Sequence, residues 1–143
     1  MTSTHPVLAA FDGHAFSALR LAQQLSRLVE QPLHVATAYR DEPVALSGGN
    51  EAVWASDQRR GVAERRMERA VGWGNDEPAT EHTVIATERI ADGLLDLAAE
   101  LGACVMVLGP DQRGEVTREV LRRANVPVLV LPRGAMVPEA VHS

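Results

Sequence analysis

Residues 90–109 have the sequence IADGLLDLAAELGACVMVLG, and their pattern indicates the fold class. The first half is typical of an amphipathic helix, because apolar residues recur at three- and four-residue steps. The positions of this stripe are Ile90, Leu94, Leu97, Ala98 and Leu101. Cys104–Leu108 is then apolar throughout, as expected for a strand that is buried on both faces. A helix that leads into a buried strand is the repeating unit of parallel α/β proteins.

The same alternation extends outward from this unit in both directions. Four more apolar runs are predicted to be strands: Val7–Phe11, Leu33–Tyr39, Thr83–Thr87 and Pro127–Leu131. Helical patterns separate them: a stripe of Ala18, Ala22, Leu25 and Val29, a polar helix over about Glu51–Val71, and a short stripe of Val116, Val120, Leu121 and Ala124. We therefore expect a five-stranded parallel sheet with helices on both faces. The residues expected in its core are Leu94, Leu97, Val105, Val107, Val120 and Leu129.

Length and composition narrow the function classes. A chain of 143 residues suits one domain, expected over residues 1–132 and followed by a loose tail over residues 133–143. All 14 basic residues are arginine, which excludes lysine chemistry such as Schiff-base formation. The net charge of −5 and an aromatic content of 3% argue against nucleic-acid binding. No run can span a membrane and no secretion signal is visible, so a cytoplasmic location is expected.

Parallel sheets bind ligands beyond the carboxyl ends of their strands, where the strand order reverses. This rule directs attention to Asp12-Gly13, to the loop after Tyr39, and to Gly109–Gly114. Asp12 either caps the following helix or binds a ligand, with capping favoured from the residue alone. Gly109–Gly114 joins a buried strand to a helix N-terminus, whose free N–H groups suit phosphate. The alternative is that Glu115 only complements the dipole of that helix.

Histidine, cysteine and arginine side chains are interpreted structurally. His34 lies inside an apolar strand and is predicted to be a hydrogen-bonded core histidine. The single cysteine, Cys104, and the scattered histidines predict no metal site. Arginines interleave with carboxylates along the polar helix, which favours a solvated helix face over an anion or nucleic-acid patch. These arginines are Arg59, Arg60, Arg65, Arg66 and Arg69.

Over nearly its whole length the chain resembles the universal stress protein family. The resemblance is carried by Val7–Gly13, Leu33–Val35, Ala91–Gly109, Gly114–Thr117 and Val120–Val130, the last being the most specific. It implies a three-layer α/β sandwich of the adenine nucleotide alpha hydrolase-like type, with strand order 3-2-1-4-5. It also implies a non-catalytic stress protein that acts through association with an unknown protein partner. A homodimer formed through the strand Pro127–Leu131 is part of the same expectation.

ATP-binding members of that family have a glycine motif of the form G-x2-G-x9-G-[S/T]. Here Gly109 and Gly114 would be its outer glycines, but only four residues separate them and Glu115 replaces the Ser or Thr. We therefore expect no tight ATP binding and no resident cofactor.

The alternative is a member that binds ATP or AMP and acts as a nucleotide-dependent switch. In that case Asp12 and the backbone of Val35 would contact the adenosine part, and the phosphate side would be lined by Gly109, Gly114, Glu115 and Val116. A small hydrolase on the same fold is a third hypothesis. It is disfavoured because lysine, a nucleophile elbow and metal ligands are missing from the sequence.

Overall fold

The computed structural model describes residues 4–12, 16–40, 49–73, 81–109 and 114–132. Strands and helices alternate strictly within these ranges. The strands are β1 (Val7–Ala10), β2 (Leu33–Arg40), β3 (Glu81–Thr87), β4 (Val105–Leu108) and β5 (Val128–Val130). The helices are α1 (Phe16–Val29), α2 (Gly49–Trp73), α3 (Ile90–Leu101) and α4 (Glu115–Arg123). The predicted loose tail, residues 133–143, lies outside the described residues.

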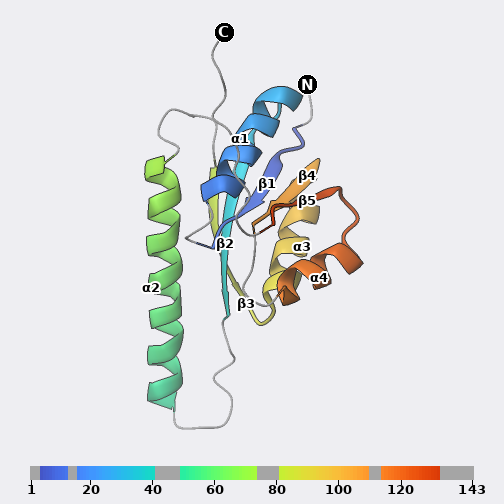
Figure 1. Ribbon diagram of the computed structural model, residues 1–143. Helices are drawn as coiled ribbons and strands as arrows, with labels where there is room; N and C mark the ends of the chain where they lie inside the picture. The colour runs from blue at the N-terminus through green and yellow to red at the C-terminus, as the bar shows by residue number, and fades with distance from the viewer. Residues whose placement is uncertain (1–3, 13–15, 41–48, 74–80, 110–113, 133–143) are drawn as a thin grey trace.

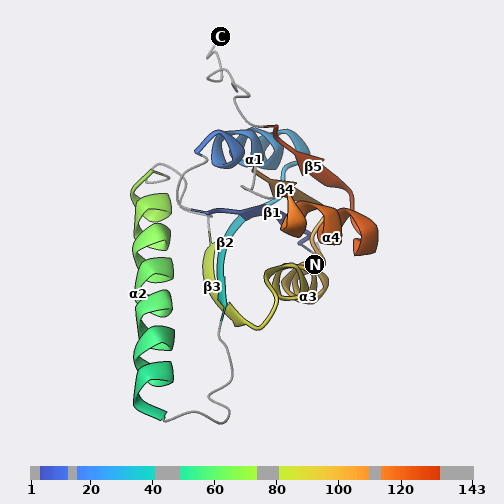
Figure 2. The same ribbon diagram turned by 60° about the horizontal axis from the view of Figure 1, so that its bottom comes forward.

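All five strands form one parallel sheet with the order β3-β2-β1-β4-β5. β1 is central, and its last residue, Ala10, lies opposite both Ala36 of β2 and Leu108 of β4. α1 and α2 cover one face of the sheet, and α3 and α4 cover the other (Figure 1, Figure 2). The predicted α/β class and strand order are therefore confirmed. The order reverses between β1 and β4, because the chain fills the β2 and β3 side first.

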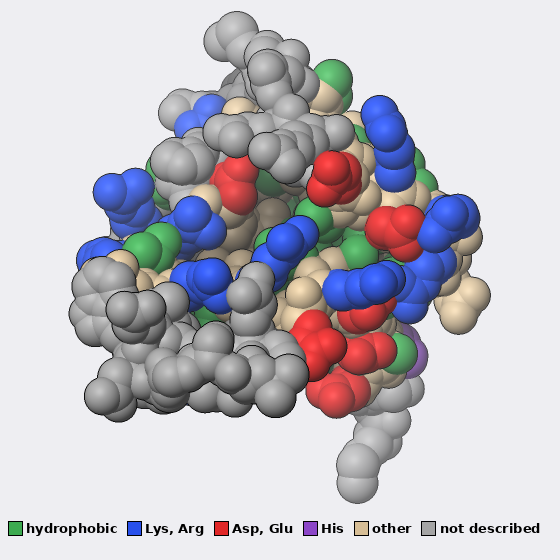
Figure 3. All heavy atoms as spheres, turned by 90° about the horizontal axis from the view of Figure 1, so that it is seen from below, with side chains coloured by type: hydrophobic (Ala, Val, Ile, Leu, Met, Phe, Trp, Pro, Cys, Tyr) green, Lys and Arg blue, Asp and Glu red, His purple; other side chains and the backbone are tan. Residues whose placement is uncertain are grey.

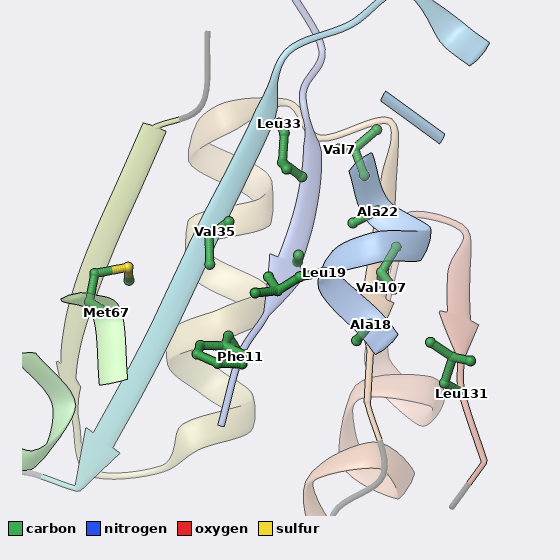
Figure 4. Packing of buried hydrophobic residues seen from close by; sticks show 11 residues of the cluster. Val7, Phe11, Ala18, Leu19, Ala22, Leu33, Val35, Met67, Val107 and Leu131 are labelled. Carbon is green, nitrogen blue, oxygen red and sulfur yellow. The ribbon is translucent and has the colours of Figure 1, made fainter. Parts of the chain in front are cut away.

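The face under α1 holds a core of aliphatic and aromatic side chains (Figure 4). Leu19 of α1 is 1% exposed and packs in one cluster with Val7 and Val107 of the central strands. Met67 joins this cluster from α2. Burial of each such side chain stabilises the fold by about 1.5–3 kcal/mol relative to an exposed one. α1 and α2 are therefore held to the sheet mainly by apolar contact.

The opposite face packs against α3 and α4 through a second cluster, which contains Leu94 and Val120. Both residues are buried as predicted, and so is Val107 on the α1 side. Leu97 and Val105 are only half-buried, so the prediction for these two positions is corrected. For Leu97 the reason is helix phase, because Leu94 and Ala98 face the sheet more directly.

Leu129 is 41% exposed, so its prediction as a core residue is wrong. It lies in β5, the last strand of the sheet, whereas α1 packs on β1, β2 and β4 and leaves this edge less covered. Leu121 is 53% exposed, because its neighbour Val120 faces the sheet and successive helical residues are turned by about 100°. Val29, at the end of α1, is also exposed. Apolar side chains near these element ends therefore remain at the surface of the chain.

Three strands are shorter than predicted. β1 ends at Ala10 instead of Phe11. β4 begins at Val105, so the free Cys104 lies just before the strand and is half-buried. β5 covers only Val128–Val130 of the predicted Pro127–Leu131, although Leu131 still donates its N–H to the Leu108 carbonyl at 2.9 Å. None of the described helices is long and apolar enough to cross a membrane.

His34 is confirmed as a hydrogen-bonded core histidine between β2 and β3. Its Nε2 lies 2.6 Å from Thr83 Oγ1, and its Nδ1 lies 3.6 Å from a carboxylate oxygen of Glu81. Burial lowers the pKa of His34 below its ordinary value of 6.5; the Glu81 charge partly opposes this shift and His82 adds to it. Burial also lowers the pKa of His82, whose buried Nε2 has no hydrogen-bond partner among the described residues. Both imidazoles are therefore favoured in the neutral form.

The free energy of unfolding should consequently fall as the pH is lowered from about 7 to about 5. The pKa of His34 is lower in the folded chain, so the unfolded chain binds the proton first. The stability contributed by the neutral imidazole is complete above pH 6.5 and is lost as the pH falls below that value. Urea unfolding at the two pH values measures the loss, which His34→Gln should reduce. An undiminished loss in the variant would contradict this origin.

Candidate functional site

A cavity of about 160 Å³ opens at the carboxyl ends of the central strands. Its floor comes from β1, β2 and β4, where Ala10, Ala36, Ala38 and Leu108 line it. The first turns of α3 and α4 form two walls, and Arg66 of α2 lines it as well. This is the point where the strand order reverses, the usual location of ligand sites in open α/β sheets. The structure therefore supports the location predicted from the strand pattern.

Asp12 is held at the edge of this cavity by two hydrogen bonds of the residue before it. The Phe11 N–H donates to the Ala36 carbonyl at 2.8 Å, and the Thr37 hydroxyl donates to the Phe11 carbonyl at 3.1 Å. Thr37 is 1% exposed, so the second bond is shielded from water. Asp12 itself is exposed and lines the cavity. Its predicted capping role concerns residues 13–15, which lie outside the described residues.

The α3 wall is apolar and begins at a fixed turn. Thr87 Oγ1 donates to the Arg89 carbonyl at 2.8 Å and accepts from the Arg89 N–H at 3.3 Å. This turn starts α3 directly after β3, so that Ile90 and Leu94 face the cavity. Their side chains and Leu108 offer an apolar surface of the kind that packs against a flat ring.

The α4 wall begins at Gly114, which has a φ of +71° and stands at the N-cap of α4. That left-handed conformation suits glycine, which has no Cβ. Val116 and Thr117 of the first turn line the cavity, whereas Glu115 is exposed and is not among its lining residues. Glu115 does lie in the first turn of α4, where a carboxylate complements the helix dipole.

The six predicted site residues are thus divided by the structure. Asp12, Gly109 and Val116 line the cavity together, while Gly114 and Glu115 stand at the start of α4 outside the described lining. The side chain of Val35 is 2% exposed and lies in the core cluster with α1, whereas Ala36 and Ala38 of the same strand line the cavity. Contact of any of these residues with a nucleotide stays a prediction.

Two polar side chains that line the cavity were not among the predicted site residues. Thr117 brings a hydroxyl to the α4 wall, and Arg66 brings a guanidinium from α2. The sequence does contain a signal for Arg66, because it follows Arg59 and Val62 at the spacing of one helical face. That face lies next to the buried Ala63 and Met67. The interleaved charges of the polar helix obscured this spacing.

A second recess, of about 390 Å³, adjoins the cavity between the end of β2 and α2. Arg40, Arg59 and Arg66 line it, together with Tyr39 and Gln58. We call it the arginine recess. Figure 3 looks onto the carboxyl ends of the strands and shows arginine side chains gathered around a hollow. The prediction of a plain solvated helix face is therefore incomplete, because two arginines of α2 line a recess.

Tyr39 is hydrogen-bonded to an arginine that is not among the residues lining the recess. Arg60 Nε donates to Tyr39 Oη at 3.1 Å, and this hydrogen bond raises the pKa of Arg60 above its ordinary value. Among the described residues no group of three or more histidine, cysteine or carboxylate side chains is arranged to hold a metal ion. The described lining of the cavity and the recess offers hydrogen-bonding groups, an apolar surface, the carboxylate of Asp12 and the guanidinium groups of the arginines.

In open α/β sheets, a cavity at the point where the strand order reverses is the usual location of a small-ligand site. Comparison with known proteins makes the assignment more specific. The model of the universal stress protein family matches residues 4–132. The chain belongs to the universal stress protein family. No match was found among curated proteins.

Solved structures support the same family. A universal stress protein from Archaeoglobus fulgidus is 25% identical, with a TM-score of 0.70 over 88% of this chain and 92% of that chain. A structure of the universal stress protein from the same organism in complex with dAMP is 25% identical, with a TM-score of 0.68 over 90% of this chain and 98% of the other. UspA from Lactobacillus plantarum, 15% identical, shares the fold with a TM-score of 0.73 over 92% of this chain and 99% of its own.

Proposed function

We propose that this universal stress protein is non-catalytic and binds an adenine mononucleotide more tightly than ATP. The observation that carries the proposal is the cavity at the carboxyl ends of β1, β2 and β4. It combines an apolar wall for a base with Asp12 and Thr117 as polar side chains. The Archaeoglobus relative in complex with dAMP supports the class of ligand.

The preference for one phosphate rests on the short segment between β4 and α4. Four residues separate Gly109 from Gly114, which limits the backbone N–H groups that can converge on a phosphate chain. Each hydrogen bond to a charged group is worth about 1.5–3 kcal/mol, so their loss is costly. Glu115 acts in the same direction. A carboxylate 4 Å from a phosphate charge repels it by about 1 kcal/mol in water and about 4 kcal/mol at an effective dielectric of 20.

Titration calorimetry with dAMP, and separately with ATP and magnesium, should therefore give a dissociation constant for dAMP at least about tenfold lower. Tenfold corresponds to about 1.4 kcal/mol, less than one such hydrogen bond. Asp12→Asn should weaken dAMP binding, because a charged acceptor at the cavity edge is lost. Asp57→Asn, at an exposed position of α2, is the matched control.

Three results would overturn the proposal. They are tighter binding of ATP than of dAMP, release of phosphate from ATP at a rate that depends on this protein, and no binding of dAMP. Mass spectrometry of the freshly purified, denatured protein adds an independent readout, since a retained adenine mononucleotide would support the proposal.

We further propose that two copies associate through β5. Leu129 and Val130 are 41% and 38% exposed on this edge strand, and natural proteins cover apolar edges. A homodimer through β5 would bury them and leave the cavity, at the strand ends, open to a ligand. Sedimentation at micromolar concentration tests this, and a monomer would contradict it. The cytoplasmic location and the unknown protein partner stay predictions.

A further inference from the structure

One face of α2 is turned toward the candidate site. Arg59, Val62 and Arg66 follow each other at steps of three and four residues, and all three line the arginine recess. Ala63 and Met67, at 0% and 7% exposure, bury the adjoining face of the helix against the sheet. The direction of the two arginines is therefore set by a packed helix rather than by a loop.

The recess has an unusual charge balance for a chain with a net charge of −5. Its described lining contains three guanidinium groups and no carboxylate. Two arginines elsewhere in the described chain are paired with carboxylates, Arg122 with Glu119 at 2.7 Å and Arg123 with Asp92. Within the described residues no ion pair joins Arg40, Arg59 or Arg66 to a carboxylate. Grouped like charges raise each other's energy, and an anion among them relieves it.

The position of Arg59 in the recess is fixed by a hydrogen bond within the chain itself. Arg59 Nη1 donates to the Arg40 carbonyl at 3.3 Å, which ties the guanidinium to the end of β2. Arg59 and Arg66 are half-buried, so water screens them less than it screens a fully exposed arginine. Planar guanidinium groups bind phosphate oxygens through paired N–H donors.

The arginine recess is continuous with the cavity. Ala38, Arg66 and Ile90 line both, and Arg66 therefore stands at the junction between an apolar compartment and a basic one. A ligand with a flat apolar part and an anionic group could occupy both compartments at once.

We propose that the arginine recess binds the phosphate group of the ligand, with Arg59 and Arg66 as its donors and Arg40 adding positive charge. The group bound from the α2 side of the site would then be the single phosphate of the mononucleotide. The identity of the nucleoside part rests on the proposed function, but the capacity of the recess for phosphate does not.

The first test distinguishes the contribution of the recess to ligand affinity from that of the cavity. It uses calorimetry with dAMP and with 2′-deoxyadenosine, which lacks the phosphate. Arg66→Gln and Arg59→Gln should each weaken dAMP binding by about tenfold or more. Binding of 2′-deoxyadenosine should change by less than about twofold. Arg65→Gln removes the same charge from the next, exposed position of α2 and should leave both ligands unaffected. Thermal unfolding of each variant confirms that it is folded.

The second test uses inorganic diphosphate and needs no nucleoside. Millimolar diphosphate should raise the Tm of the parent above its value at equal ionic strength in chloride, because a ligand of the folded state stabilises it. The rise should be lost in Arg66→Gln and kept in Arg65→Gln.

The outcomes distinguish this inference from the proposed function. Unchanged dAMP affinity in both Arg59→Gln and Arg66→Gln would overturn the inference and leave nucleotide binding intact. An equal loss in Arg65→Gln would also overturn it, since the effect would then be general charge. If the parent binds neither dAMP nor 2′-deoxyadenosine, the proposed function fails. The diphosphate experiment then tests phosphate binding by the arginine recess on its own. A rise in Tm that depends on Arg66 would support phosphate binding, and no rise would overturn it.

Discussion

Leu94→Ala should lower the free energy of unfolding by about 2–5 kcal/mol, a large part of the roughly 5–15 kcal/mol of a typical domain. Leu94 is 2% exposed in the cluster between α3 and the sheet, so its truncation removes buried apolar contact and leaves a void. It also lines the cavity of the candidate site, and on the proposed function the substitution should therefore weaken the binding of a nucleoside as well. Urea unfolding measures the first effect, and calorimetry with 2′-deoxyadenosine measures the second.

Leu97→Ala is the matched control on the same helix. Leu97 is half-buried and is not among the residues that line the cavity, so its truncation should cost about 1 kcal/mol and leave ligand binding unchanged. If Leu97→Ala cost as much as Leu94→Ala, the phase of α3 against the sheet would be wrong.

Gly93→Ala should destabilise the protein by about 1–2 kcal/mol, although alanine favours helices. A Cβ at this position would lie 2.9 Å from Ile85 Cγ2 and 3.0 Å from Thr87 Cβ. Both atoms belong to β-branched side chains next to the backbone of β3, which cannot move aside easily. Overpacking of this kind costs about 1–3 kcal/mol, against a gain of about 1 kcal/mol in helix propensity. Urea unfolding of parent and variant measures the net effect.

Gly61→Ala makes the same change within α2, but there we expect the free energy of unfolding to rise instead of fall. Among the described residues the new Cβ would meet only the end of the Arg65 side chain, at 3.5 Å, an ordinary contact. The helix propensity of alanine should then stabilise the protein by about 0.5–1 kcal/mol. Stabilisation by both substitutions would show that α3 does not approach β3 as closely as described.

Much of the fold could be predicted because each unit repeats one signal. The stripe over residues 90–101 and the apolar run that follows it specify a helix and a buried strand, and the remaining units have the same form. The exposure of side chains in the edge strand β5 could not be predicted from this repeated signal. Leu129 has the residue type of a core position, and its exposure depends on how far α1 extends across the sheet.

The location of the cavity could be predicted from the sequence, but not every residue that lines it. Asp12 and Gly109 follow strands, and strand ends can be located from the sequence. Val35 and Ala36 lie in a strand that is apolar on both faces, so no alternation indicates which of them faces α3. Arg66 was missed because charge alone does not report which helical face meets a neighbour.

The floor of the cavity has a consequence for how binding can change among related chains. The part of the floor that β1 and β2 provide is made of alanines, whose side chains have no atom beyond Cβ. These are Ala10, at the end of β1, and Ala36 and Ala38 of the neighbouring β2. The small size of these side chains leaves room for the hollow above them. Valine at one of these positions would begin to fill it while suiting a β-strand well. A change of one side chain can therefore fill this pocket without a change of fold.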